Sequence, residues 1–171
     1  MIDRVLIDTL SLRAQDFAVK WKDKIRKAAH LKHYNNMDDA ALMDAFTPVY
    51  PLLSRTLDRG MDRSLVGNFF VNMGKTRMRE GFSISETIYA INLSQQVVIE
   101  YLMNDFVLDN SIRMYQAMGA MSKITEFYLL GCFYLTKGFL EATYTTMSSS
   151  DKVSEALLKK YFKDDFFFKK E

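Results

Sequence analysis

Few side chains in this sequence have the type and spacing that catalysis or ligand binding requires. Only two histidines occur, His30 and His33, and they flank Leu31 and Lys32. Phosphoryl transfer through His30 is one chemistry to consider, since imidazole is nucleophilic near neutral pH. Haem binding is another, but haem needs an axial ligand, commonly a histidine, and none follows His33. Histidine chemistry is therefore a weak expectation.

Motifs for metal, nucleotide and nucleophile chemistry are absent from the sequence. It contains neither HExxH nor CxxC, and neither histidine has a Glu three residues before it, as di-iron bundles require. GxGxxG, GxxxxGK[ST] and GxSxG are also missing. The single cysteine, Cys132, cannot form an internal disulfide and is typical of a small core residue. We predict no catalytic residue, no metal and no cofactor, in a reducing, cytoplasmic compartment.

Charge and composition bear on the classes of binding partner that the chain could have. The net charge of +2 is too small to indicate nucleic acid binding. The most apolar stretch, residues 127–135, is too short to span a bilayer, so no membrane partner is expected. A local basic face lies in residues 20–33, where Asp23 is the only acid among Lys20, Lys22, Lys24, Arg26, Lys27 and Lys32. It is typical of a solvated helix end, and an anionic partner is the open alternative.

The elements that must position these residues are helices. Two prolines and seven glycines leave long uninterrupted segments, and apolar residues recur at helical spacing. We predict an all-α helical bundle of about five to seven helices, with Trp21 as a core anchor. The predicted helices cover residues 2–31, 38–46, 48–59, 62–80, 84–106, a long helix over 109–147 in the C-terminal half, and a final amphipathic helix from 151.

Glycines recur every seven residues, at Gly60, Gly67, Gly74 and Gly81, and again at Gly131 and Gly138. Gly60 and Gly81 are predicted to end helices. Gly67 and Gly74 lie two turns apart on one face of the helix between them, and glycine costs about 1 kcal/mol against alanine there. A close helix crossing explains that cost, with Gly131 and Gly138 on its other side; coincidence is the alternative.

The helix over residues 84–106 begins with Ser83-Ile84-Ser85-Glu86, which predicts a capping box. Its middle is unusually polar. The polar residues there are Asn92, Ser94, Gln95 and Gln96. We expect most of them to face solvent, and an internal hydrogen-bond network is the other interpretation.

The long helix carries one stripe with alternating steps of four and three residues, as in bundles and coiled coils. The stripe supplies the candidate interface or pocket: Met114, Met118, Met121, Tyr128, Cys132 and Leu135. We divide the chain into a sensor-like bundle over 1–147 and a serine hinge with a C-terminal helix over 148–171. The latter packs on the bundle or on a partner, because Phe166, Phe167 and Phe168 need cover.

Residues 74–86 read GKTRMREGFSISE: a helix with Gly and Arg, a Gly turn, an aromatic residue, and a new helix with an early Glu. This pattern resembles a signature of the N-terminal domains of RsbR/RsbRD-type regulators, which also occur ahead of sensor histidine kinases. The resemblance extends over about residues 17–139. It implies an all-helical, non-enzymatic signal-input domain that typically dimerises and usually feeds an output module. The chain is then either a stand-alone domain or a piece of a larger sensor.

The resemblance transfers four residues, Gly74, Arg77, Gly81 and Glu86, to this sequence. Their implied role is structural, with Arg77 pairing with Glu86 across the turn; a ligand-binding arginine is the alternative. The position after the arginine, often Ala in the family, is Met78 here.

We therefore expect a homodimeric regulatory domain that passes a change in helix packing to a regulatory partner or output module. The main alternative is a protein that binds a small apolar ligand in an interior rich in methionine and phenylalanine. Histidine phosphotransfer ranks lower, because such bundles follow their histidine with one residue and then Leu-Lys-Gly, unlike His30-Leu31-Lys32. Membrane-surface binding by the final helix also ranks lower, since its mixed acids favour a protein contact.

Overall fold

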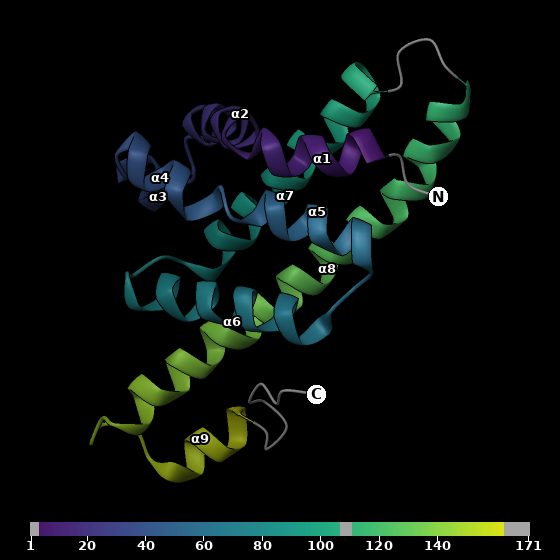
Figure 1. Cartoon of the computed structure of the whole chain (residues 1–171). Coiled ribbons are helices and arrows are strands. Elements are labelled where there is room, and N and C mark those ends of the chain that lie inside the picture. Colours follow the sequence, from purple (N-terminus) through teal and green to yellow (C-terminus); the bar gives the residue numbers. More distant parts are fainter. Residues whose placement is uncertain (1–3, 107–110, 163–171) are drawn as a thin grey trace. The chain divides into compact units, whose positions relative to one another are not determined.

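The structure, a computed structural model, describes residues 4–106 and 111–162 (Figure 1). Every regular element in these ranges is helical, which confirms the predicted all-α class. The helices are α1 (Arg4–Leu12), α2 (Ala14–Lys27), α3 (Lys32–Asn36), α4 (Asp39–Phe46), α5 (Val49–Arg59), α6 (Arg63–Arg79), α7 (Ile84–Tyr101), a π-helical turn η1 (Leu102–Phe106), α8 (Ser111–Ser148) and α9 (Glu155–Tyr161). The predicted start of the long helix at Asp109 and the three tail phenylalanines lie outside the described residues.

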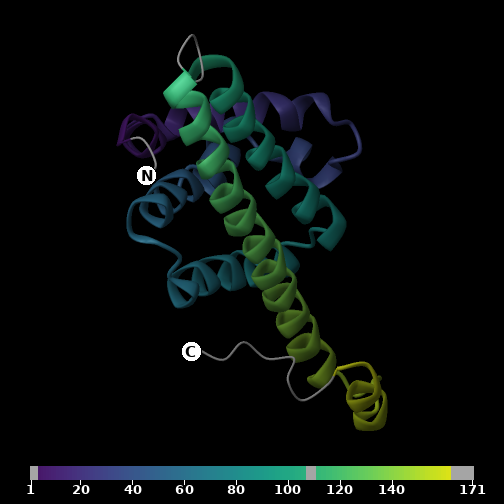
Figure 2. The same cartoon turned by 90° about the vertical axis from the view of Figure 1, so that its right-hand side faces the viewer.

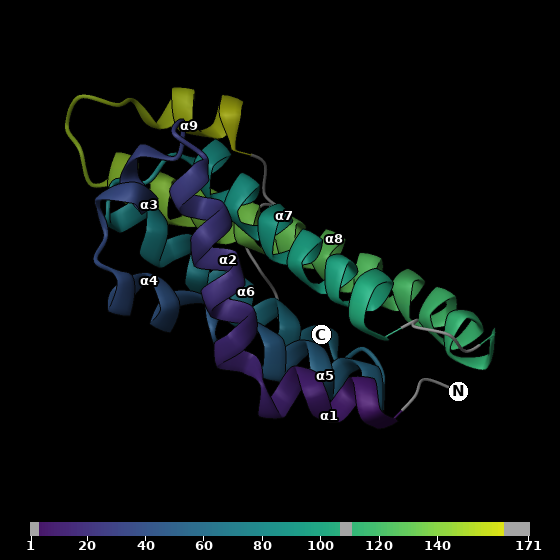
Figure 3. The same cartoon turned by 90° about the horizontal axis from the view of Figure 1, so that it is seen from above.

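The prediction of one helix over residues 2–31 is wrong. The chain leaves helical geometry at Arg13, whose φ and ψ are −108° and 27°, and α2 ends at Lys27. The break lets α1 lie along α5, where Leu6 and Leu10 are fully buried (Figure 3). The apolar spacing continues across Arg13, so periodicity alone did not reveal it. With this break and the short α3, the described residues hold more helices than the predicted five to seven.

The chain divides into two compact units. Unit 1 comprises Met1–Asp62 and Tyr89–Leu129, and unit 2 comprises Arg63–Ile88 and Leu130–Glu171. This division differs from the predicted boundary at residue 148, because α9 falls in unit 2 together with α6. The long helix α8, a single continuous helix of 38 residues, contributes to both units (green in Figure 2).

Trp21 is an anchor of the unit 1 core, as predicted. Its side chain is fully buried, and its ring stacks on Phe46 with centroids 4.0 Å apart. The indole Nε1 donates to the Ala90 carbonyl oxygen at 2.8 Å. A buried indole N–H that finds a partner avoids the desolvation cost of an unpaired donor. Trp21 thereby ties α2 to α7.

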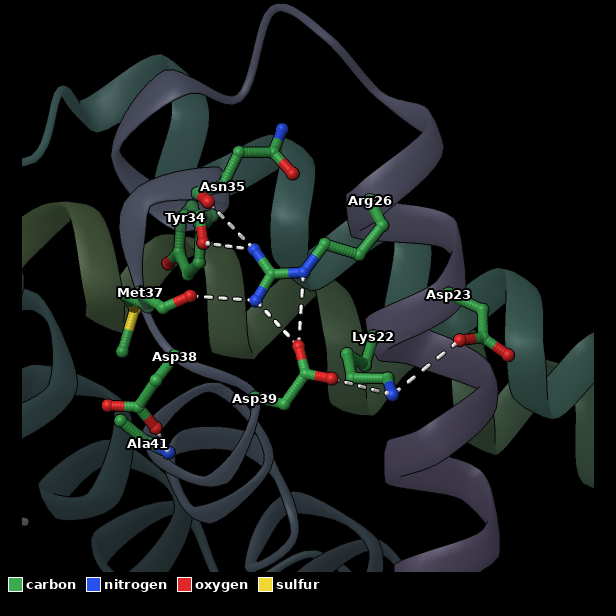
Figure 4. Close-up of polar contacts among 9 residues, drawn as sticks. All are labelled: Lys22, Asp23, Arg26, Tyr34, Asn35, Met37, Asp38, Asp39 and Ala41. Atoms are coloured by element: carbon green, nitrogen blue, oxygen red, sulfur yellow. Dashed lines mark hydrogen bonds and ion pairs between the residues drawn. The ribbon is translucent and has the colours of Figure 1, made fainter.

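Arg26 fixes the turn between α3 and α4 to α2 (Figure 4). Its guanidinium donates to the backbone carbonyls of Tyr34, Asn35 and Met37 at 3.2, 3.0 and 2.7 Å. It also contacts the Asp39 carboxylate at 2.7 Å, and Lys22 reaches the same carboxylate at 3.2 Å. Hydrogen bonds from Arg26 and then Lys22 lower the pKa of Asp39 below its ordinary value. Part of the predicted basic face therefore has a structural role.

Unit 2 is built around a close crossing of α6 and α8 (Figure 1). A Cβ at Gly74 would overlap the Leu135 carbonyl oxygen, and a Cβ at Gly138 would overlap the Val71 carbonyl oxygen. A Cβ at Gly131 would meet the Phe70 ring at 2.9 Å. The predicted crossing is confirmed at Gly74, Gly131 and Gly138, because only a residue without Cβ permits such a close approach. The part of Gly67 in the crossing stays a prediction.

Candidate functional site

The candidate stripe on α8 divides into exposed and buried residues. Met114 and Met118 expose 55% and 65% of their surface. Tyr128 and Leu135 are buried, while Met121 and Cys132 are intermediate. A seven-residue repeat drifts by about 20° per heptad on a straight helix, so such a stripe moves across the helix surface. The predicted residues thus share a stripe without forming one surface.

An apolar surface on unit 1 includes the exposed members of this stripe. We define the α8 apolar face as Met114, Met118, Met121, Thr125 and Leu129. Leu129, which the prediction did not include, exposes 67% of its surface. A shallow groove of about 570 Å³ runs along the face, and its lining comes from α8 alone: Met118, Met121, Ser122, Thr125, Glu126 and Leu129. Contiguous exposed apolar residues of this kind mark interaction surfaces.

A buried hydroxyl network lies on the inner side of the same part of α8. The Ser94 hydroxyl lies 2.9 Å from the Tyr128 hydroxyl and 3.2 Å from the Tyr50 hydroxyl. Tyr50 in turn donates to the Phe17 carbonyl oxygen at 3.4 Å. Burial raises the pKa of Tyr50 well above 10.0, with the Ser94 hydrogen bond acting in the opposite direction, so the phenol stays neutral. The network joins α5, α7 and α8 without an ionised group.

Ser94 is the buried member of the polar patch Asn92, Ser94, Gln95 and Gln96 of α7. Asn92 and Gln96 are exposed, as expected, and Gln95 is of intermediate burial. Ser94 is fully buried. Ser94 lies one helical turn after Ala90 and Ile91, which are buried, and this spacing could have predicted that Ser94 is buried too.

Cys132 is a free thiol of intermediate burial. Burial raises the pKa of this thiol, which disfavours the reactive thiolate. The arrangement fits packing better than nucleophilic or redox chemistry.

The signature residues form a helix stop followed by a helix start. Gly81 has φ of 82°, its N–H donates to the Met78 carbonyl, and the Phe82 N–H donates to the Arg77 carbonyl. These two bonds make a Schellman motif, which requires the left-handed conformation that glycine adopts without strain. Ser83 then caps α7, accepting from the Glu86 N–H at 3.2 Å. The turn is thus fixed by backbone bonds.

Arg77 is buried beside this turn. It forms an ion pair with Glu80, and its guanidinium lies 4.8 Å from the centroid of the Phe82 ring. This cation–π contact packs the arginine over the residue that closes the Schellman motif. The predicted pair of Arg77 with Glu86 stays a prediction.

The two histidines lie apart from these features. His30 is exposed in the turn after α2, with its ring 4.7 Å from the Tyr89 ring. His33 is exposed on the five-residue α3. Neither lies on a long helix. In the part of the chain that the structure describes, no three His, Cys, Asp or Glu side chains gather in a way that would hold a metal ion.

Comparisons with known proteins assign no family. No family model, curated protein or solved structure matches this chain. The resemblance of residues 74–86 to RsbR/RsbRD-type regulators therefore stays a prediction. Among residues 4–106 and 111–162, no helix has both the length and the apolar character needed to cross a bilayer.

Proposed function

We propose that this chain is a non-enzymatic, cytoplasmic signal-input domain that forms a homodimer through the α8 apolar face. The exposure of Met114, Met118 and Leu129 on one side of a helix carries this proposal. The opposite side of the same helix is buried, with Ala120 and Ile124 fully covered. The partner is a second copy of this chain, because two-fold symmetric pairing lets one surface cover itself.

Two further properties of the face favour pairing. Methionine side chains adapt to a partner surface because they are unbranched and polarisable. The steps of four and three residues from Met114 to Thr125 match the repeat by which helices pack along their length. A single cysteine, which cannot form an internal disulfide, fits the cytoplasmic assignment.

Signal transmission would use α8 itself. The α8 apolar face is followed on the same helix by Leu135 and Gly138, which contact α6. Packed helices have discrete arrangements, so a shift or rotation of α8 at the dimer interface would change the α6 crossing. That change would reach an output module or regulatory partner.

The alternative function, binding of a small apolar ligand, has one observation in its favour. The groove of about 570 Å³ over Met118 and Leu129 has the volume of many ligand sites. Its lining comes from a single helix, however, so a bound ligand would stay largely exposed. Ligand sites usually bury most of the ligand, and this favours the dimer.

The test measures association of the full chain by native mass spectrometry and light scattering. We expect a dimer of apo mass, and we expect the double variant Met118→Glu, Leu129→Glu to weaken association by about 100-fold or more, since pairing would bury charge. Its control is Leu12→Glu, which replaces an apolar residue by a carboxylate at a site that is 85% exposed on α1. The control should remain dimeric.

Two outcomes contradict the dimer. If the wild-type protein is monomeric at about 100 µM, the proposed dimer is contradicted, because specific regulatory pairs associate more tightly. A monomer that retains extra mass, lost in the Met118→Glu, Leu129→Glu variant, would support the ligand-binding alternative instead.

A further inference from the structure

A cleft in unit 1 lies between α2 and the C-terminal end of α7, and the proposed dimer does not use it. Its volume is about 370 Å³, within the range of small-molecule sites. We call it the α2–α7 cleft. Side chains of α2 form one wall, and side chains of α7 and η1 form the other.

The wall from α2 is basic. Lys20, Lys24 and Lys27 line the cleft, and steps of four and three residues place them on one face of the helix. Lys22 and Arg26 face another way, toward Asp39. The basic segment recognised in the sequence therefore has two faces, one that holds the fold together and one that lines a cleft.

The wall from α7 supplies apolar surface and an amide. Val97 is buried, and the half-buried Tyr101 ring packs edge-on against Phe17 with centroids 5.3 Å apart, which fixes its orientation. Asn104 adds its side-chain amide from η1. π-helical turns are uncommon and occur often at functional sites. The cleft thus offers cations, an aromatic surface and a neutral hydrogen-bonding group together.

Acidic residues set the charge that a ligand would meet. Glu100 pairs with Lys24 at 2.7 Å across the cleft, and Asp23 also lines it. Three lysines and two carboxylates leave one positive charge in excess. The Lys24–Glu100 pair is solvent-accessible, with 27% and 54% of the side chains exposed, and exposed pairs contribute little. A dianion can therefore replace Glu100 at Lys24.

We propose that the α2–α7 cleft binds a small organic phosphate ester. The ammonium groups of Lys20, Lys24 and Lys27 hold the phosphate oxygens by charge-assisted hydrogen bonds. The half-buried Tyr101 ring contacts the organic group. This binding site stands independently of dimerisation through α8, since none of these residues belongs to the α8 apolar face.

The test is calorimetric titration of the full chain with phenyl phosphate and with inorganic phosphate at low salt. We expect phenyl phosphate to bind more tightly, because only it reaches the apolar wall. Lys24→Ala and Lys27→Ala should each weaken binding about tenfold. Lys32→Ala, from the same basic segment but outside the cleft lining, should bind like the wild type. Circular dichroism checks that each variant is folded.

The most decisive part of the experiment is a variant that should bind phenyl phosphate more tightly than the wild type. Glu100→Gln removes the competing carboxylate and leaves Lys24 available, so phenyl phosphate should bind several-fold more tightly, and added salt should weaken that binding. Absence of binding to both the wild type and Glu100→Gln at about 10 mM would overturn the proposal, since such affinity is too weak for a specific site. Equal binding of both probes, or an equal loss in Lys32→Ala, would also overturn it.

Discussion

The two halves of α8 serve different packing roles. In unit 1, Met114 and Met118 expose more than half of their surface. In unit 2, Gly138 approaches α6 so closely that a Cβ would overlap the Val71 carbonyl oxygen. Both halves carry apolar or small residues at helical spacing. The difference shows that spacing identifies a face of a helix, whereas the tertiary neighbours decide whether that face is covered by the same chain.

The largest effect on stability is expected from replacing one glycine in each half of α8 by alanine. Gly138→Ala should lower the free energy of unfolding by about 3 kcal/mol, because the new Cβ forces α6 and α8 apart. The matched control is Gly119→Ala in the first half, where a Cβ would meet nothing within 4 Å. The control should raise the free energy of unfolding by up to about 1 kcal/mol, the helix propensity difference. Urea unfolding measures both, and similar effects at the two sites would contradict the comparison.

A smaller effect on stability is expected from removing one carboxylate in each half of α8. Glu141 exposes only 6% of its side chain and pairs with Lys75 of α6 at 2.7 Å. Glu141→Gln should cost about 2 kcal/mol, less than a fully buried pair, because Lys75 is 32% exposed. Glu126→Gln, an exposed change in the first half, should stay within about 0.5 kcal/mol of wild type. If Glu141→Gln also left the free energy of unfolding unchanged, the Lys75–Glu141 ion pair would not stabilise the crossing of α6 and α8.

The smallest effect compares the buried side of the first half of α8, which Ser94 of α7 contacts through Tyr128, with its exposed side. Ser94→Ala removes the hydroxyl that lies between Tyr50 and Tyr128, and we expect the free energy of unfolding, measured in urea, to fall by about 1 kcal/mol. Ser122→Ala, on the exposed groove, should be neutral. A neutral Ser94→Ala would show that the buried hydroxyls find other partners.

Much of the fold was predictable from the sequence. Gly60 and Gly81 have φ of 91° and 82°, as expected for glycines that end helices. Ser83 caps α7, accepting from the Glu86 N–H at 3.2 Å, as the Ser83-Ile84-Ser85-Glu86 sequence predicts. Trp21 is a core anchor. These features depend on residues close in sequence or on a large apolar side chain with no favourable alternative to burial.

The candidate site was predictable only in part. The stripe included Met114 and Met118, which are exposed, and also Tyr128 and Leu135, which the chain buries in its own core. Leu129 was missed because it lies beside the stripe. The signature turn was placed at the correct residues, yet its resemblance to a family assigns no function by itself.

By itself, the sequence determined the helical class, the caps and the glycine pairing of α6 with α8. Each follows from local backbone preferences or from a repeated spacing that distant segments share. Only the tertiary structure decided that the first helix breaks at Arg13, that Ser94 lies inside, and that Lys20, Lys24 and Lys27 line a cleft. Those outcomes depend on which helices lie opposite each residue, and burial is a property of these neighbours, not of the residue type.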